Sequence, residues 1–243
     1  MVTLLKKEIA SFFSSLIGYI VITIFLLGTG LFLWVFDGEL NIFQTGYAGL
    51  DGLFMIAPWI FLFLAPAISM RFFADESKSG TIELLFTFPI SDRSIVLAKF
   101  FAGLTLMLIA LIPTVLYYIT VYALGSPVGN IDTAATIGAY IGLVFLAGVY
   151  IAIGTFVSSV TDNQIISFIV SAALCFVFFI GFDFIAEVFP EGFLKRTSMS
   201  LGIRQHYDSV SRGVVDTRDI IYFLSVMGFF LYLTMVSLEK KHK

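Results

Sequence analysis

The segment RFFADESKSGTIELLFTFPISDRSIVLAK, residues 71–99, decides how this chain is organised. It holds over a quarter of the charged side chains in about an eighth of the length. It also separates two apolar runs, each of which is long enough to cross a bilayer. Lipid explains most of the remaining sequence, but it does not explain this charged segment.

The segment has the pattern of a helix, a turn and a second helix. Gly80 is expected to break the incoming helix, and Thr81 is a candidate cap of a short helix with Glu83 in its first turn. Pro89 ends that helix because it has no amide hydrogen. Ser91 is a second candidate cap, from which a helix runs into the next apolar stretch.

Ile82, Leu85 and Phe86 fall on one side of the short helix at helical spacing. Two interpretations stay open at this point. The segment is either an interfacial elbow that turns the chain and lies on lipid, or a docking element for a partner protein in the cytoplasm.

Composition identifies the class of protein. Of the 243 residues, 59% are apolar and 13% are charged, against roughly 25% charged in soluble domains. With a mean hydropathy of +1.00, the chain is expected to be an integral membrane protein. The single cysteine, Cys175, excludes an internal disulfide and a cysteine metal cluster. The first apolar run, residues 16–36, is too long for a cleaved signal core and predicts a retained anchor.

Apolar run lengths predict an all-α fold in which residues 16–238 form six membrane-spanning helices. The expected spans are residues 16–36, 53–71, 97–124, 134–159, 165–183 and 219–238. Pro58, Pro66 and Pro113 predict kinks. Gly138 and Gly142 form a G-x-x-x-G pattern that permits close helix approach.

Residues 1–15 precede the first span and carry a stripe at positions 4, 5, 8, 9, 12 and 13, with Lys6 and Lys7 opposite. This pattern predicts an amphipathic helix in the membrane interface, with its lysines toward anionic headgroups. The alternative is a simple cytoplasmic extension of the first span.

Lysine and arginine positions predict the orientation. Both termini and the stretch 71–99 carry lysines and arginines, whereas the loops 37–52 and 125–133 carry none. The termini, the coupling region at 72–96 and the tail at 239–243 are therefore expected in the cytoplasm. Residues 184–218 form an extracytoplasmic loop by counting spans, although they carry five basic residues nearly balanced by four acids. Arg204, Asp208 and Arg212 are spaced four apart, which suits paired charges on a helix.

The usual catalytic patterns are absent from the sequence. It contains no P-loop, no zinc-protease motif and no serine-hydrolase elbow, and His206 and His242 lie far apart. The centres of the spans contain no charged residue, so an ion-driven transporter is disfavoured. We therefore expect neither an enzyme nor a metal, cofactor or nucleic-acid site in this chain. Energy for any transport would come from a separate motor at the charged elbow.

Residues 76–100 resemble the pattern E-x-x-x-G-T-[IL]-E-L-L-x-x-x-P-[IV]-S of ABC-2 type permeases, the membrane subunits of ATP-binding-cassette exporters. The matching positions are Glu76, Gly80, Thr81, Glu83, Leu84, Leu85, Pro89, Ser91 and Lys99. Residues 206–225 resemble the end of the family's last outer loop, through Arg212, Gly213, Asp216 and Asp219. Asp216 also suits the cap of the sixth helix. The chain departs from many relatives at Leu201, where they carry a proline.

This resemblance implies the ABC-2, or type V exporter, fold with a cytoplasmic coupling helix. It implies an ATP-binding-cassette ATPase that carries the ATP and Mg and docks on this segment, through Glu76, Gly80, Thr81, Ile82, Glu83, Leu85, Phe86, Pro89 and Arg93. Glu76 and Glu83 would be polar anchors for the ATPase or neighbouring helices, or simply solvated acids. His206, Arg212 and Asp216 are the candidate outer-loop or partner residues.

The sequence is most similar to gliding-motility-associated permeases of the bacterial inner membrane. That likeness implies a GldA-like ATPase and either a GldG-like second membrane subunit with an external domain or a second copy of this chain, in contact with membrane lipid. The alternative function is a membrane scaffold that transports nothing. An enzyme acting within the membrane is a third and weaker possibility.

Overall fold

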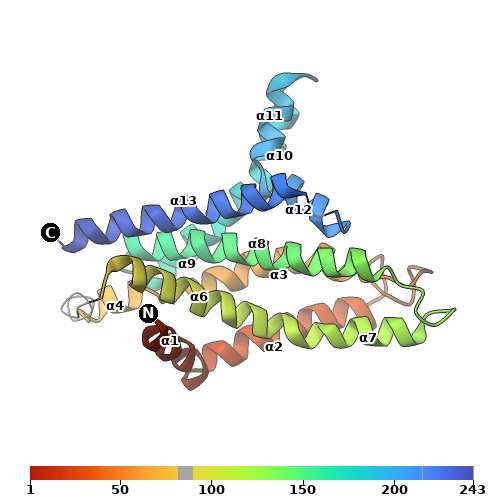
Figure 1. Ribbon diagram of the computed structural model, residues 1–243, viewed down its shortest axis with the longest axis horizontal. Coiled ribbons are helices and arrows are strands. Elements are labelled where there is room, and N and C mark those ends of the chain that lie inside the picture. The colour runs from red at the N-terminus through yellow and green to blue at the C-terminus, as the bar shows by residue number, and fades with distance from the viewer. Residues whose placement is uncertain (82–89, 215, 243) are drawn as a thin grey trace.

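The structure is a computed structural model that describes residues 1–81, 90–214 and 216–242, and its described part is all-α, as predicted (Figure 1). Six of its helices are long and apolar enough to cross a membrane. The elements are α1 Val2–Ser14, α2 Leu16–Gly30, η1 Leu31–Val35, α3 Asp51–Ser69, α4 Ala74–Lys78, α6 Asp92–Leu111, η2 Ile112–Thr114, α7 Val115–Leu124, α8 Thr133–Val160, α9 Gln164–Phe176, η3 Val177–Gly181, α10 Phe182–Val188, α11 Phe193–Leu201, α12 Ile203–Ser211 and α13 Thr217–His242.

Helix α8 forms the centre of the bundle. It packs against α3, α6, α9, α12 and α13. Within its apolar 18-residue stretch, 78% is buried. The corresponding apolar stretches that begin in α2 and α9 are only 28% buried, so these helices lie at the periphery. A helix that is apolar on all sides and covered by neighbours is the expected core of such a bundle.

Glycines allow α8 to approach α12 and the turn after it closely. A Cβ built on Gly138 would lie 2.8 Å from the Cα of Gly213, and one built on Gly142 would lie 3.1 Å from Val210 Cγ1. Gly213 itself has a φ of +86°, which favours glycine over residues with a Cβ. The close approach predicted from the G-x-x-x-G pattern is therefore confirmed.

The prolines act in two ways. At Pro113 the helix is interrupted by the 3₁₀ turn η2, which separates α6 from α7. Helix α3 instead continues through Pro58 and Pro66. Pro58 cannot donate to the carbonyl of Phe54, and the buried Tyr207 hydroxyl of α12 donates to that carbonyl instead, at 2.6 Å.

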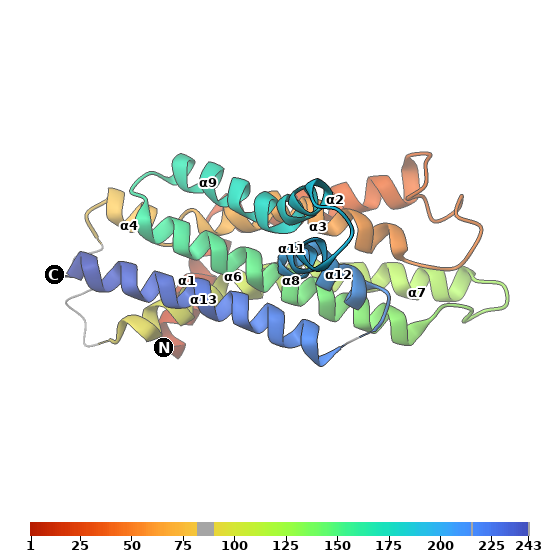
Figure 2. The same ribbon diagram turned by 90° about the horizontal axis from the view of Figure 1, so that it is seen from above.

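The molecule has two distinct ends. Both chain termini lie at one end together with α4 and the start of α6, which we call the terminal end (Figure 1). The segments 36–50 and 125–132 lie at the opposite end, the far end. Between the two ends, α10 and α11 leave the side of the bundle as a hairpin, after the π-helical turn η3 redirects the chain from α9 (Figures 1 and 2).

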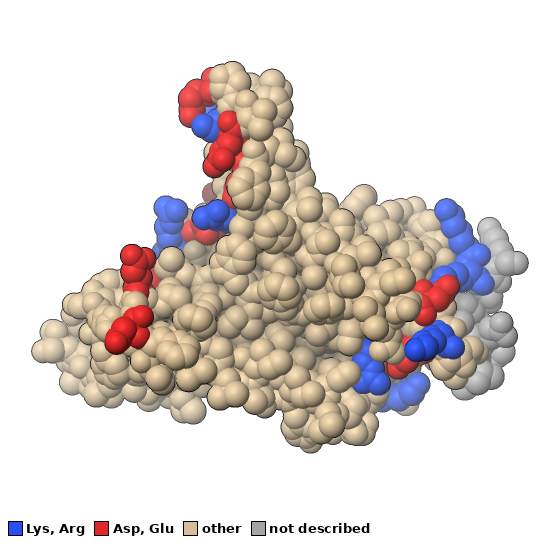
Figure 3. All heavy atoms as spheres, turned by 180° about the vertical axis from the view of Figure 1, so that it is seen from behind, with Lys and Arg blue, Asp and Glu red and all other residues tan. Residues whose placement is uncertain are grey.

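Charged side chains gather near the two ends and on the hairpin, and a broad belt between them is free of charge on the visible face (Figure 3). Peripheral helices expose large apolar side chains along this belt, including Ile20, Ile24 and Leu27 of α2, Ile165, Ile169 and Val170 of α9 and Ile221, Leu224 and Phe229 of α13. Such a belt suits contact with lipid.

Candidate functional site

A buried lysine joins three elements at the terminal end. Lys99, in the second turn of α6, is 1% exposed. Its Nζ lies 2.8 Å from Oε1 of Glu76 in α4 and 3.2 Å from Oε1 of Glu8 in α1. The same Nζ lies 5.2 Å from the ring centroid of Phe73, within range of a cation–π contact. We call Lys99, Glu76 and Glu8 the ionic junction.

The junction depends on all of its members. A buried ammonium is stable only when it is paired and hydrogen-bonded, and removal of one partner of a buried pair is strongly destabilising. Glu76 has one buried carboxylate oxygen, Oε2, without a hydrogen-bond partner in the described part of the chain. Two carboxyl groups thus contact the one ammonium of Lys99.

A hydroxyl of the central helix fixes the start of α4. Ser158 of α8 is buried, and its Oγ accepts hydrogen bonds from the backbone N–H groups of Phe73 at 3.0 Å and Ala74 at 3.1 Å. Free N–H groups at a helix start need such acceptors. The core helix thus holds the same α4 that carries Glu76.

A second set of polar contacts surrounds the junction nearer the surface. Ser77 donates to Asp162 at 2.6 Å, and Lys241 of α13 lies 3.0 Å from the same carboxylate. The hydrogen bond from Ser77, followed by the hydrogen bond and charge of Lys241, lowers the pKa of Asp162 below its ordinary value. Asp75 accepts from Gln164 at the start of α9 and pairs with Arg71 at 3.6 Å. These contacts tie α4 to α9 and to the end of α13.

The chain leaves α4 through a glycine in the left-handed backbone conformation, which agrees with the helix break predicted from the sequence. Gly80 has a φ of +70°, and the N–H of the exposed Thr81 donates to the Glu76 carbonyl at 3.0 Å. Ser91 occupies the cap position of α6, although its Oγ contacts the Ser94 hydroxyl at 2.9 Å and not a backbone amide.

The structure separates the predicted docking residues into three groups. Glu76 is committed to Lys99, whereas Gly80, Thr81 and Arg93 are exposed. The other predicted positions lie outside the described residues: Ile82, Glu83, Leu85, Phe86 and Pro89.

Sequence reasoning missed the ionic junction. The sequence points to Lys99 only as a position that matches the family pattern, and to Arg93 as a docking residue. The available signal was Glu8, an acid inside the otherwise apolar stripe of residues 1–15. A carboxylate on a buried helix face requires a cationic partner, and Lys99 supplies it from 91 residues away.

At the far end, His206 and Asp216 have structural roles. His206 Nδ1 lies 2.6 Å from Asp219 Oδ1, Nε2 lies 2.9 Å from the Ser200 carbonyl, and the ring stacks on Tyr222 with centroids 3.9 Å apart. These contacts fasten α12 to the first turn of α13.

Asp216 caps α13 as predicted, since its Oδ1 accepts from the Arg218 N–H at 2.9 Å. Arg204 pairs with Asp208 at 3.7 Å, as the spacing predicts. Arg212, in contrast, is exposed and does not reach Asp208 within 4.0 Å, so the second expected pair was wrong. The charge of Arg212 is therefore left available near the α12 surface.

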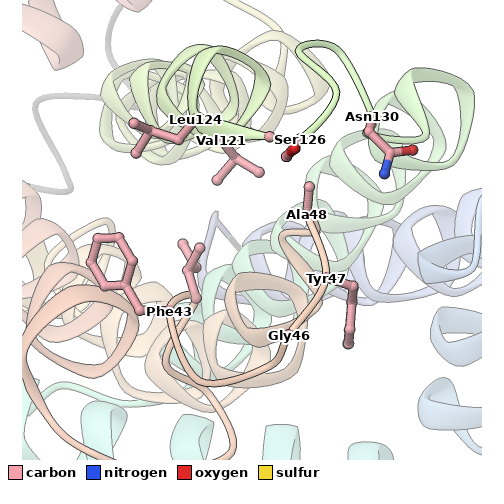
Figure 4. Close-up of a pocket in the computed structure, with 10 residues that line it drawn as sticks. Phe43, Gly46, Tyr47, Ala48, Val121, Leu124, Ser126 and Asn130 are labelled. Carbon is pink, nitrogen blue, oxygen red and sulfur yellow. The ribbon is translucent and has the colours of Figure 1, made fainter.

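A separate hollow of about 310 Å³ lies at the far end, where residues 42–48 face the end of α7 (Figure 4). Phe43, Val121 and Leu124 supply apolar walls, and Ser126 and Asn130 supply polar groups. No Lys, Arg, Asp, Glu or His lines the described hollow. It marks the place where two connecting segments of the far end meet.

The polar contacts of the terminal end link several helices to one another. Within the described ranges, no group of three or more His, Cys, Asp or Glu residues could hold a metal ion. The densest polar network instead connects α1, α4, α6, α8, α9 and α13 at one end of an apolar bundle. A force applied at this end would therefore reach several spans.

Comparison with known proteins identifies the family. A family model described as ABC-2 family transporter protein matches residues 2–238. No curated protein matches the chain. Because the family match covers nearly the whole length, this chain belongs to the ABC-2 family as a membrane permease component of a transporter, and the permeases of this family lack a catalytic ATPase domain.

Proposed function

We propose that residues 76–93 receive a separate ATP-hydrolysing subunit and that the ionic junction passes its movement to the membrane spans. The observation that supports this most directly is the 2.8 Å contact between Glu76 and Lys99. It joins the two helices that flank residues 79–91, so both sides of the proposed docking segment are held as one unit.

Force would travel along defined contacts. A push on the docking segment loads α4 and α6 together, because the junction resists their separation. Glu8 carries the load to the interfacial helix α1, and Ser158 carries it to the central helix α8. Buried ionic and hydrogen-bonded contacts suit this task because they have fixed geometry and tolerate little displacement.

The partner proposed here is an ATP-binding-cassette ATPase that holds the ATP and Mg. We assign the chain to a GldF-type, gliding-motility-associated transporter with a GldA-like ATPase. The second membrane subunit is either GldG-like or a second copy of this chain. We place this chain in the bacterial inner membrane with both of its termini in the cytoplasm. This placement agrees with the position of the two termini at one end of the molecule (Figure 1).

The test is retention of the co-expressed ATPase on an affinity-tagged permease. Glu83→Lys reverses a charge within the proposed docking segment. We expect it to reduce recovery of the ATPase about tenfold or more, since a misplaced charge at an interface costs several kcal/mol. The matched control is Glu39→Lys, which makes the same charge change at an exposed far-end position.

The comparison of the two variants decides the proposal. Both should be recovered from the membrane in equal amounts as folded protein. Full ATPase retention by Glu83→Lys would refute docking on this segment. Equal loss in Glu39→Lys would show that the effect is not specific to it.

A further inference from the structure

A second cavity, of about 370 Å³, opens between α3, η3 and α12 towards the far end. Its apolar wall consists of Met55, Trp59 and Phe179, and its polar rim carries Arg204, Arg212, Asp51 and Asp208. The volume lies at the lower end of the range for small-ligand sites, in which apolar walls usually accompany a few polar groups. An apolar wall beside a charged rim suits a ligand that has both an apolar part and a charged part.

Tyr207 holds the walls of the cavity in place. Its hydroxyl is 2.6 Å from the Phe54 carbonyl that Pro58 leaves free, and the residue is 3% exposed. The hydrogen bond clamps α12 onto α3, the two helices that supply most of the lining. The cavity is therefore preformed, which lowers the entropy that a ligand loses on binding.

The rim offers charges of both signs. Arg204 lies 3.5 Å from Asp183 and 3.7 Å from Asp208, longer than charge-assisted hydrogen bonds of about 2.7–2.9 Å. Its guanidinium therefore keeps donors for a ligand. Arg212 forms no ion pair with the described residues. Partial burial raises the pKa of Asp208 despite the nearby arginines, so a cationic ligand group would stabilise its carboxylate.

The cavity lies where the apolar surface meets charged groups. Met55 is 62% exposed and Trp59 is 43% exposed, so the apolar wall is open to the surroundings of the bundle. Trp59 packs edge-on against Phe179, with ring centroids 5.7 Å apart. Tryptophan concentrates at the membrane interface, where lipid headgroups begin. Arg204 and Arg212 line the polar side of the same cavity.

We propose that this cavity binds one zwitterionic phospholipid of the ethanolamine class. The phosphate contacts Arg204 and Arg212, the ammonium contacts Asp51 or Asp208, and an acyl chain lies over Met55 and Trp59. A balanced pair of guanidiniums and carboxylates favours this headgroup over a purely anionic one. The site is separate from the ionic junction and adds a lipid requirement at the opposite end of the molecule.

Trp59 provides the probe, because the chain has two tryptophans. Trp34→Phe leaves Trp59 as the single fluorophore. The full-length protein is placed in nanodiscs of phosphatidylglycerol with a minority of dibrominated phosphatidylethanolamine, and in the converse mixture with dibrominated phosphatidylglycerol. Bromine quenches tryptophan at contact. We expect stronger quenching by the minority ethanolamine lipid than by the minority glycerol lipid.

Arg212→Gln tests the rim with little risk to folding, since Arg212 forms no described ion pair. Because both lipids carry the phosphate that the arginines contact, we expect about a fivefold loss of lipid binding, seen as weaker quenching by both brominated lipids, the effect of one arginine near a lipid headgroup. Arg204→Gln should act in the same direction. Arg196→Gln on α11, which does not line the cavity, is the matched control and should leave the quenching by both lipids unchanged.

Three results would overturn the proposal. Equal quenching by both lipids, unaffected by Arg212→Gln, would show ordinary bulk lipid at Trp59. Absence of quenching by either lipid would show that protein, such as a second subunit, covers the cavity. Soluble phosphoethanolamine could also be added as a competitor. If it relieved the quenching more effectively than intact unbrominated phosphatidylethanolamine, the cavity would be assigned to a water-soluble zwitterion.

Discussion

The two ends of the bundle are held together by different physical means. At the terminal end, the ammonium of Lys99 is buried against carboxylates from two other helices. At the far end, the deepest polar contact is neutral, a Tyr207 hydroxyl on the Phe54 carbonyl. The terminal end should therefore fail when a charge is removed, and the far end when a hydroxyl is removed. This contrast suits a molecule that is loaded at one end and braced at the other.

The largest effect is expected from Lys99→Met. The change leaves two partly buried carboxylates without their cation, and breaking a buried ion pair costs about 3–5 kcal/mol. Thermal unfolding in detergent measures the loss. The control is Lys195→Met, which removes the 2.6 Å pair between Lys195 of α11 and the exposed Glu191 and should cost less than about 1 kcal/mol. Equal losses of stability in Lys99→Met and Lys195→Met would show that the buried ion pairs of Lys99 stabilise the fold no more than a surface pair does.

An intermediate effect is expected from Tyr207→Phe. The change leaves the buried Phe54 carbonyl without a donor, which costs about 1–3 kcal/mol. Tyr150→Phe is the matched control, because the buried Tyr150 hydroxyl has no hydrogen-bond partner in the described structure. Its removal should be neutral or stabilising under the same unfolding measurement. A larger loss for Tyr150→Phe would contradict the role given to the Tyr207 hydrogen bond.

The smallest effect concerns Asp162 and pH. Ser77 and Lys241 lower its pKa, so the contact stabilises the fold above the ordinary value of 3.8 and is lost as pH falls through the lowered pKa. Because Asp162 is exposed, the contribution should stay below about 1 kcal/mol. Protection of the amides near the end of α13 from hydrogen exchange, relative to their intrinsic rates, should fall under acid, and Asp162→Asn should remove this dependence. Glu239→Gln, an exposed change on the same helix, should retain it.

Local patterns predicted local features well. Run lengths predicted the six long helices, Gly80 adopts the expected left-handed conformation, and Asp216 caps α13. Each of these depends on a few adjacent residues. Pro113 likewise interrupts its helix because the missing amide acts within one turn.

Long-range contacts could not be predicted in the same way. Glu8 and Lys99 meet because α1 folds back against α6, which no local pattern specifies. Tyr207 reaches Phe54 across 153 residues, and only the free carbonyl below Pro58 hinted that a donor was needed. Glu8 in an apolar stripe and Pro58 in an apolar helix each indicated that a polar partner was needed. Which residue supplies that partner became visible only in the tertiary structure.

Sidedness of the terminal end tests the central claim most directly. Lys78→Cys and Glu39→Cys place single exposed thiols at the terminal and far ends, in a chain whose own Cys175 is buried. A membrane-impermeant maleimide should label Lys78→Cys only from the cytoplasmic side, with protection when the ATPase is bound, and Glu39→Cys only from the opposite side. Labelling of Lys78→Cys from outside, or labelling that the bound ATPase leaves unchanged, would contradict the account.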